Sequence, residues 1–176
     1  MIITRDGTRF CTGTMINNTG LNRRQLFLTA NHCLFTSPYN FVAVFNYQRP
    51  SCGGDGPDPS IIQSAHGMKL IATYAQSDFA LLEITEKIPD SYNVYLAGWD
   101  ISSAAPANVF GVHHPSGDVK KISFYNGTTV ASSWTEFPKK LHWSIPAWTR
   151  GTTEPGSSGS ALFNSRGLIV GHLHGG

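Results

Sequence analysis

An all-β fold is the architecture that this sequence predicts, and three observations support it. Short apolar or alternating runs recur along the chain, whereas helical periodicity is almost absent. The runs are rich in Val, Ile, Phe and Tyr, which favour strands. Turn sequences such as SPYN and HPSGD separate them, in a chain of 176 residues that holds 18 glycines and 10 prolines. Short strands joined by turns are typical of an antiparallel sandwich or barrel.

The runs also give an expected order of elements. We expect strands at residues 10–16, 25–30, 40–47, 69–74, 78–84, 93–99, 108–114, 119–125, 141–145, 160–165 and 168–174. The single helical candidate is a turn at 30–34. A Ser/Ala/Pro-rich stretch at 101–107 is typical of a linker, so the sequence predicts one unit at 1–100 and a second at 108–176.

Composition and charge narrow the classes of function. Apolar residues make up 40 % of the chain and charged residues 14 %, which is typical of a globular protein with a core. The formal net charge is only +2, and Lys and Arg form no dense run, so we expect no nucleic-acid partner. No apolar stretch approaches the roughly 18 residues that span a bilayer, so we expect no membrane partner either. We expect a monomer that acts on protein or peptide substrates.

The three cysteines leave two interpretations open. A bridge between Cys11 and Cys33 would close a loop of about 20 residues and stabilise the fold by roughly 3 kcal/mol. Alternatively, all three are free, buried thiols. With the bridge, Cys52 has no partner, and the polar start MIITRDGTRF does not resemble a signal peptide. We therefore interpret the chain as part of a longer, secreted precursor.

Three segments contain candidate catalytic residues, namely LTANHC at 28–33, SDFALLE at 77–83 and EPGSSGSALF at 154–163. Each alone has an ordinary explanation as a packed histidine, a capping aspartate or a flexible turn. Their order along the chain is histidine, aspartate, serine, which is the order of the chymotrypsin-type triad and not that of α/β-hydrolases. The sequence therefore predicts His32, Asp78 and Ser158 as the catalytic residues, with Asp100 as the next candidate for the acid.

The residue types suit acyl transfer. A serine hydroxyl is a weak nucleophile and needs a neighbouring base. Histidine, with an ordinary pKa of about 6.5, can take that proton and later return it to the leaving amine. Asp78 would fix the orientation of the imidazole. The backbone N–H groups of Gly156 and Ser158 are the expected oxyanion hole, where losing one donor costs roughly 3–4 kcal/mol in the transition state.

The three segments resemble the motif blocks of chymotrypsin-like serine peptidases, most closely those of the bacterial lysyl endopeptidase branch. The resemblance implies two six-stranded antiparallel β-barrels, truncated at both ends, with His32 and Asp78 in the first and Ser158 in the second. It extends from Cys11 to the last residue through further matching segments: VFNYQ (44–48), ATYAQSDF (72–79), LAGWD (96–100), VHHP (112–115), KKIS (120–123), TEPGSSGS (153–160) and GHLHGG (171–176).

The resemblance also implies a substrate site. Trp134 and His174 match an aromatic pair that lies beside the catalytic histidine, although a core tryptophan and an ordinary strand histidine are the alternatives. Thr152 stands at the pocket position where trypsin-like members have aspartate. These residues and Gly175 are expected to bind substrate. A preference for lysine before the scissile bond is implied, with the selecting acidic residue beyond Gly176.

Ser157 stands where most animal-type members have an aspartate that pairs with a newly cut N-terminus. A serine has no negative charge to make that ion pair. The resemblance therefore implies activation, where needed, by removal of a prosegment.

Two other functions remain open. One is a catalytically silent pseudo-protease, whose triad or oxyanion loop would be broken; neither is broken in this sequence. The other is a carbohydrate- or surface-binding β domain, suggested by Trp143 and Trp148. That interpretation leaves the three motif segments unexplained.

A histidine cluster raises the question of a metal site. His66 and His142 carry no signal for either a metal or a catalytic role. No Cys, Asp or Glu completes a zinc-like set at useful spacing, so we expect no metal and no cofactor. The residues that prompt the question are His113, His114, His172 and His174.

Overall fold

The computed structural model describes residues 1–53, 56–134 and 137–176. Its described residues form strands and short 3-10 turns and no α-helix. The strands are β1 (Ile2–Thr4), β2 (Arg9–Cys11), β3 (Thr14–Ile16), β4 (Leu26–Ala30), β5 (Phe41–Val44), β6 (Ser64–His66), β7 (Met68–Tyr74), β8 (Phe79–Ile84), β9 (Ala107–His113), β10 (Lys121–Thr128), β11 (Val130–Trp134), β12 (Phe137–Ser144), β13 (Ala161–Phe163) and β14 (Ile169–His172). The 3-10 turns are η1 (Asn31–Cys33), η2 (Pro38–Asn40), η3 (Ala75–Ser77), η4 (Asp90–Tyr92) and η5 (Pro115–Gly117).

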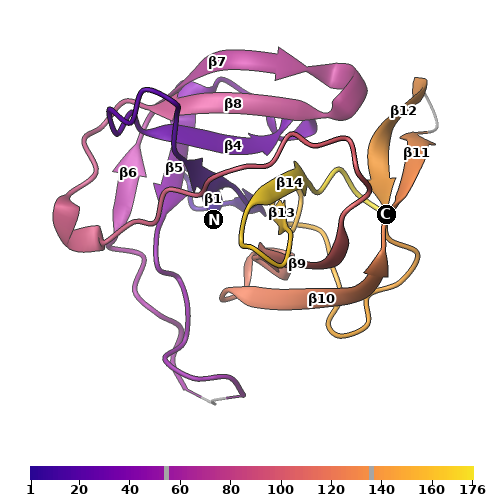
Figure 1. Ribbon diagram of the computed structural model, residues 1–176. Coiled ribbons are helices and arrows are strands. Elements are labelled where there is room, and N and C mark those ends of the chain that lie inside the picture. The colour runs from indigo at the N-terminus through magenta and orange to yellow at the C-terminus, as the bar shows by residue number, and fades with distance from the viewer. Residues whose placement is uncertain (54–55, 135–136) are drawn as a thin grey trace.

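The strands pair antiparallel in four sheets (Figure 1). The first half of the chain forms two of them, in the orders β2-β1-β5-β6 and β3-β4-β8-β7. The second half forms the sheet β10-β9-β13-β14 and the hairpin β11-β12. The predicted all-β class is confirmed. These pairings form open sheets, and no closed barrel is found among the described residues.

Most of the expected strands and the expected turn at 30–34 are present, the latter as η1. The expected strand 10–16 is divided between β2 and β3. The expected strand at 93–99 is wrong. This segment makes only single parallel bridges, from Ala97 to Ile16 and from Trp99 to Ile169, because it runs between two sheets instead of along one. Strands β1, β6 and β11 escaped prediction, because the first two are three residues long and the third is VASSW, with few apolar residues.

Strand β4 connects two hydrophobic clusters. It is buried at every position, as β5 also is, and it lies between β3 and β8. Alternate side chains of a strand point to opposite faces. Accordingly, Phe27 packs in a cluster formed by the first half of the chain, and Leu28 packs in a second cluster with Ala161 and Ile169 of the second half. The second cluster therefore contains residues of both halves and packs the two halves together.

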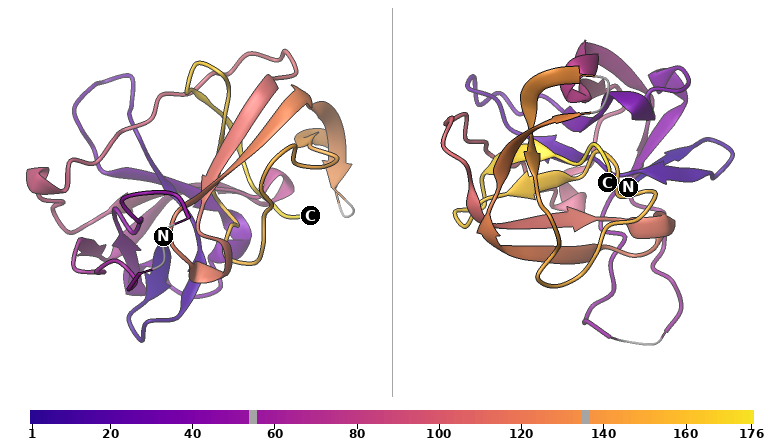
Figure 2. Two further views of the ribbon diagram at one scale, coloured as in Figure 1. Left: turned by 90° about the horizontal axis from the view of Figure 1, so that it is seen from below. Right: turned by 90° about the vertical axis from the view of Figure 1, so that its right-hand side faces the viewer.

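The two halves meet along β14. Residues 100–106 form no strand and lead from one set of sheets to the other. β14 is an edge strand of its own sheet, and it faces the strands of the first half in both views (Figures 1 and 2). The Ile169 N–H donates to the Gly98 carbonyl at 2.9 Å, and the Asp100 N–H donates to the Ile169 carbonyl at 2.8 Å. This contact brings the residues that follow β14 beside the first half.

The disulfide Cys11–Cys33 is confirmed, and it ties β2 to η1 with a Cα–Cα distance of 6.3 Å. Both cysteines are buried, whereas Cys52 is an exposed free thiol. The bridge spans a sequence separation of 22. Since His32 immediately precedes Cys33, the disulfide also anchors the turn that carries this histidine.

Reduction of this disulfide is expected to lower the free energy of unfolding by roughly 3 kcal/mol, because the unfolded chain regains the entropy of an open loop. Urea unfolding with and without a reducing agent measures the change. A Cys52→Ser variant is the control, and it should respond to reduction as the parent protein does. Equal stability of the oxidised and reduced forms would contradict a stabilising role for the bridge.

Candidate active site

His32 and Asp78 come together because they extend two paired strands. In the antiparallel pair β4–β8, Ala30 lies opposite Phe79. His32 follows the end of β4 in η1, and Asp78 immediately precedes β8. Asp78 has left-handed backbone angles, φ 57° and ψ 24°, a conformation that aspartate tolerates better than most residues. The strand register therefore places the two side chains next to each other.

The carboxylate of Asp78 engages His32 through both oxygens. The His32 ring Nδ1 lies 2.7 Å from Oδ2, and the His32 backbone N–H donates to Oδ1 at 2.8 Å. Asp78 is only 2 % exposed. Burial raises the pKa of Asp78, but the hydrogen bonds from the His32 side chain and backbone outweigh it, and the pKa lies below its usual range. An ionised Asp78 therefore requires the proton of the neutral His32 ring on Nδ1, which leaves the Nε2 lone pair free to act as a base.

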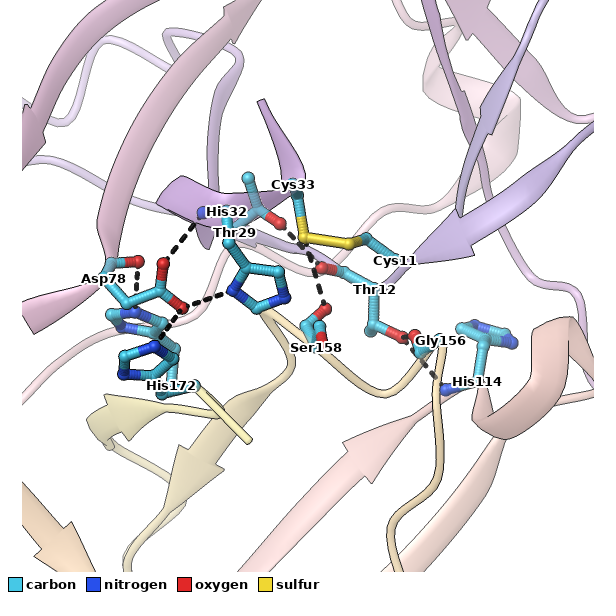
Figure 3. The surroundings of a disulfide bond; sticks show 11 residues. Cys11, Thr12, Thr29, His32, Cys33, Asp78, His114, Gly156, Ser158 and His172 are labelled. Atoms are coloured by element: carbon cyan, nitrogen blue, oxygen red, sulfur yellow. Dashed lines mark hydrogen bonds and ion pairs between the residues drawn. A yellow bond between two sulfur atoms is a disulfide. The ribbon is translucent and has the colours of Figure 1, made fainter. Parts of the chain in front are cut away.

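Ser158 lies on the other side of the His32 ring (Figure 3). Its carbonyl accepts a hydrogen bond from the Thr12 N–H at 2.8 Å, and the next N–H, of Gly159, donates to the Leu173 carbonyl at 2.8 Å. The Ser158 side chain is half-buried, and within the described part of the chain its hydroxyl has no hydrogen-bond partner. The nucleophile candidate is thus fixed through its backbone while its hydroxyl stays available.

Two glycines allow the backbone around Ser158 to turn. Gly156 has φ 95° and Gly159 has φ 80°. A Cβ at Gly156 would lie 2.9 Å from the His114 carbonyl oxygen, and one at Gly159 would lie 2.3 Å from Oγ1 of Thr29. Only glycine fits such positions without strain.

The expected oxyanion donors are free to receive a substrate oxygen. Across residues 1–53, 56–134 and 137–176, the N–H groups of Gly156 and Ser158 donate to no protein acceptor. The Thr12 hydroxyl donates to the Gly156 carbonyl at 2.9 Å and so orients the peptide that follows Gly156. Unpaired backbone donors held by a fixed loop are the feature that an oxyanion hole needs.

His174 stacks between Trp134 and His32. Its ring centroid lies 3.9 Å from that of Trp134 at an interplanar angle of 20°, and 5.9 Å from that of His32 at 24°. Nε2 of His174 lies 3.8 Å from Oδ2 of Asp78, and its Nδ1 lies 3.0 Å from Nε2 of His142. The carboxylate favours a proton on Nε2 of His174, so His142 donates and His174 accepts. The expected aromatic pair therefore extends to a third ring, from His142 in β12.

His172 holds the backbone of the aspartate. Its Nε2–H donates to the Asp78 carbonyl at 2.9 Å. His172 and His174 both turn toward Asp78, as expected from their spacing of two residues. Burial lowers the pKa of both rings, so both are neutral near pH 7.

A cavity of about 750 Å³ opens beside the stacked rings. Its lining includes residues of β11, of β12 and of the chain that follows β14. All four expected substrate-binding residues line it, together with Trp143 and Trp148, which are half-buried. Among the described residues, no acidic side chain lines the cavity. The four expected residues are Trp134, Thr152, His174 and Gly175.

The sequence model of the family described as lysyl endopeptidase, C-terminal domain, matches residues 1–176. The chain belongs to the lysyl endopeptidase family. It is 30 % identical over 181 residues to the lysyl endopeptidase of Pseudomonas aeruginosa, an alignment that covers 97 % of this chain and 38 % of that protein. The resemblance to the lysyl endopeptidase branch is therefore confirmed, and the chain spans well under half of the curated relative that it matches.

Solved serine proteases share the fold. The serine endoprotease from Yersinia pestis superposes with a TM-score of 0.60 at 14 % identity, over 97 % of this chain and 51 % of that one. An inactive form of Rv3671c from M. tuberculosis superposes with a TM-score of 0.57 at 14 % identity, over 99 % of this chain and 75 % of that one. At this identity the likeness concerns the fold alone.

Several residues that the sequence suggested as site residues do not contact His32 in the structure. The carboxylate of Asp100 binds Arg166 and accepts the Ser102 N–H, so it is committed away from His32. His114 bonds the Asp118 carbonyl through Nδ1, and His113 bonds two serines. The four histidines that raised the metal question therefore do not share a single centre.

Thr12 and His142 are site residues that sequence reasoning missed. Thr12 contacts the loop that carries Ser158 through both its backbone and its hydroxyl, and His142 contacts His174. Neither residue belongs to a motif. Thr12 lies between β2 and β3, and His142 lies in β12, so both are distant in sequence from the residues that they contact. A sequence signal for them does not exist, since only the tertiary structure brings them close.

Stability is expected to fall as the pH drops from about 6.5 toward 5. Burial lowers the pKa of His113 and His172, and it lowers that of His114 to about 2. In the unfolded chain these rings take up protons below the ordinary histidine pKa of about 6.5. In the native protein His114 stays neutral over this range, and His113 and His172 take up protons only at a lower pH than in the unfolded chain. The unfolded state then binds more protons, which costs about 1.4 kcal/mol of stability per pH unit for His114 and at most that amount for each of the other two rings. The lowered pKa of Asp78 adds a loss only near and below pH 3.8.

Urea unfolding at pH 7.5, 6.5 and 5.0 measures this dependence. A His114→Gln variant cannot take up that proton, so its stability should vary less steeply with pH even if it is lower throughout. Equal stability of the parent protein at pH 7.5 and 5.0 would contradict the presence of buried neutral histidines.

Proposed function

We propose that this chain is a serine endopeptidase unit that hydrolyses peptide bonds through an acyl-enzyme on Ser158. The observation that carries the proposal is the position of His32. Its ring Nδ1 bonds one oxygen of Asp78, its backbone N–H bonds the other, and the ring lies against Ser158 on its far side (Figure 3). A base oriented by a buried carboxylate beside a serine is the arrangement that activates a hydroxyl for attack.

The reaction proceeds in two halves. Nε2 of His32 takes the proton of the Ser158 hydroxyl as Oγ attacks the carbonyl carbon of the substrate, and the ionised Asp78 stabilises the resulting imidazolium. The oxyanion accepts hydrogen bonds from the N–H groups of Gly156 and Ser158. His32 then returns the proton to the leaving amine, which breaks the peptide bond and leaves an ester on Ser158. Water, activated by the same histidine, hydrolyses that ester.

We infer that the two halves of the chain are the two β-barrel units of the chymotrypsin-like fold. Residues 1–100 supply His32 and Asp78, residues 108–176 supply Ser158, and 101–107 is the linker. The division of the sheets supports this assignment, because strands of the two halves pair only within their own half, apart from single bridges. The six-stranded form of each barrel is part of the proposal.

The cavity beside His174 is the proposed substrate site. Trp134 and His174 would cover the catalytic aspartate on that side and keep water from its hydrogen bonds, which are stronger in a less polar surrounding. Thr152 and Gly175 would contact the side chain and backbone of the substrate. A preference for lysine is drawn from family membership, and it requires a carboxylate that is not among the described lining residues.

We propose that the protein works outside the cytoplasm as a monomer, with protein or peptide substrates. The disulfide Cys11–Cys33 supports this location, because such bridges persist mainly in oxidising compartments. No helix among the described residues is long and apolar enough to cross a membrane.

Labelling with a fluorophosphonate probe tests the proposal. We expect the folded protein to react covalently and peptide mass mapping to locate the adduct on Ser158. Cleavage of a peptide library then reports the residue preferred before the scissile bond. A folded protein that neither labels nor cleaves would be a pseudo-protease. Retention on polysaccharide beads, in a protein that does not label, would instead indicate a binding domain.

A further inference from the structure

A buried histidine outside the triad contacts the residue next to Ser158. His113, the last residue of β9, is 1 % exposed. Its Nδ1 lies 2.8 Å from the Ser157 hydroxyl, and its Nε2 lies 3.0 Å from the Ser123 hydroxyl of β10. Ser157 is itself fully buried. The ring therefore links the nucleophile loop to two strands of the sheet behind it.

These hydrogen bonds form a series, and the direction of each one follows from the bond that Ser123 makes at one end of the series. The Ser123 hydroxyl donates its single proton to the Thr152 carbonyl at 2.9 Å, so toward His113 it can only accept. Nε2 of His113 must then carry a proton. Burial lowers the pKa of His113, so the ring is neutral and Nδ1 bears a lone pair. Nδ1 accordingly accepts the proton of the Ser157 hydroxyl.

Both ends of this series of hydrogen bonds lie on the loop that carries Ser158. Oγ of Ser157 also accepts the Glu154 N–H at 3.2 Å, and the Ser157 N–H donates to the Glu154 carbonyl at 2.9 Å. At the other end lies the carbonyl of Thr152. The bonds thus run from Glu154 through Ser157, His113 and Ser123 back to Thr152. One network of hydrogen bonds therefore connects three residues of the segment that carries the oxyanion donors, and its central groups, His113, Ser123 and Ser157, are buried.

We propose that His113 is a positioning residue that holds residues 152–158 in the conformation with the N–H groups of Gly156 and Ser158 open to the oxyanion. The inference rests on the proposed function and deepens it. Ser157 has no charge to form an ion pair, and its hydroxyl meets the neutral ring of His113 instead. The Thr12 hydroxyl holds the same loop from the opposite side through the Gly156 carbonyl. These two contacts hold the loop through uncharged groups, and the Glu154 carboxylate of the same loop accepts a further hydrogen bond from the Ser116 hydroxyl at 2.9 Å.

Removing the Ser157 hydroxyl breaks the network at its centre. In Ser157→Ala, Nδ1 of His113 and the Glu154 N–H both lose their partner, and we expect the loop to populate other conformations. We expect kcat to fall on the order of 10-fold, less than the roughly 10²- to 10³-fold that follows loss of an oxyanion donor itself. KM should change little, because the cavity residues remain in place.

Thr129→Val is the matched control. Thr129 is a buried hydroxyl whose Oγ1 has no partner among the described residues, so its removal leaves no group unpaired. Its kcat and KM should equal those of the parent protein.

Two conservative variants of His113 separate positioning from bulk packing. Asparagine places an amide oxygen near the position of Nδ1 and can still accept from Ser157. Glutamine reaches the position of Nε2 and preserves the contact to Ser123 instead. Both substitutions replace the buried imidazole ring by a smaller side chain, so the melting temperatures of the two variants should fall by similar amounts. We expect His113→Asn to retain more kcat than His113→Gln. Equal or reversed kcat values would overturn the inference.

Nitrogen NMR on a Ser158→Ala protein gives a readout that is independent of turnover. We expect His113 to be neutral with its proton on Nε2, and the Nδ1 tautomer or a charged ring would overturn the inference. Kinetics of the parent protein distinguish a failure of the proposed function from a failure of the inference about His113. If it neither labels nor cleaves, the proposed function fails and the inference falls with it. If it is active and Ser157→Ala has the same kcat, only the inference is wrong.

Discussion

Ser158→Ala is expected to lower kcat for peptide hydrolysis by about 10⁶-fold, the loss recorded for removal of the serine in a triad protease. The hydroxyl oxygen is expected to form the bond to the substrate carbonyl, because Ser158 lies beside the His32 ring (Figure 3). The fold should not change, because the hydroxyl makes no hydrogen bond within the described residues and the loop is held by its backbone. Labelling by a fluorophosphonate should disappear together with hydrolysis.

The matched control for this variant is Ser165→Ala. Ser165 is exposed in the turn between β13 and β14, and its loss should leave hydrolysis and labelling unchanged. Thermal melting should be the same for both variants and the parent protein. Hydrolysis that survives in Ser158→Ala at a level above that of a mock preparation would mean that another residue is the nucleophile.

Asp78→Asn is expected to lower kcat on the order of 10⁴-fold, the loss recorded for the same exchange in the chymotrypsin-type triad. The asparagine amide would donate toward Nδ1 of His32 and so favour the ring tautomer with its proton on Nε2. That tautomer cannot accept the Ser158 proton. The geometry should persist, since the amide oxygen can still accept the His32 backbone N–H that now bonds Oδ1.

Asp100→Asn tests whether the acid has been assigned correctly. Asp100 was the alternative acid from sequence, but its carboxylate binds Arg166 and the Ser102 N–H. We expect this variant to keep the kcat of the parent protein. A loss smaller than about tenfold in Asp78→Asn, far below the 10⁴-fold of a triad aspartate, would show that Asp78 does not set the tautomer.

The fold class and most strands were predictable because burial on one face leaves an alternating pattern. β8 illustrates this, since its buried and partly buried positions alternate along FALLEI. Local pattern does not predict a strand where the pairing of the segment departs from what its sequence suggests. Residues 93–99 have a strand-like sequence but run between sheets, and β11 pairs well although its sequence is mostly small and polar. Pairing depends on the neighbouring strand, which a local pattern does not contain.

The candidate site shows the same division. Sequence order and local motifs pointed to His32, Asp78 and Ser158, and the structure gathers these residues around one imidazole (Figure 3). The same motifs gave no sign of Thr12 or of the His113 network. Those contacts join segments as far apart as Thr12 and Gly156, 144 positions along the chain.

The sequence by itself determined the class of fold, the family and the residue types available for catalysis. These properties are local, because strand propensity, glycine freedom and the chemistry of serine, histidine and aspartate belong to single residues or short segments. Only the tertiary structure decided which groups act on one another: that His32 bonds both oxygens of Asp78, that His142 lies within hydrogen-bond distance of His174, and that His113 forms a hydrogen bond with the Ser157 hydroxyl. Such contacts depend on strand register and on burial of the cluster between the two halves, and both arise only when distant segments pack together.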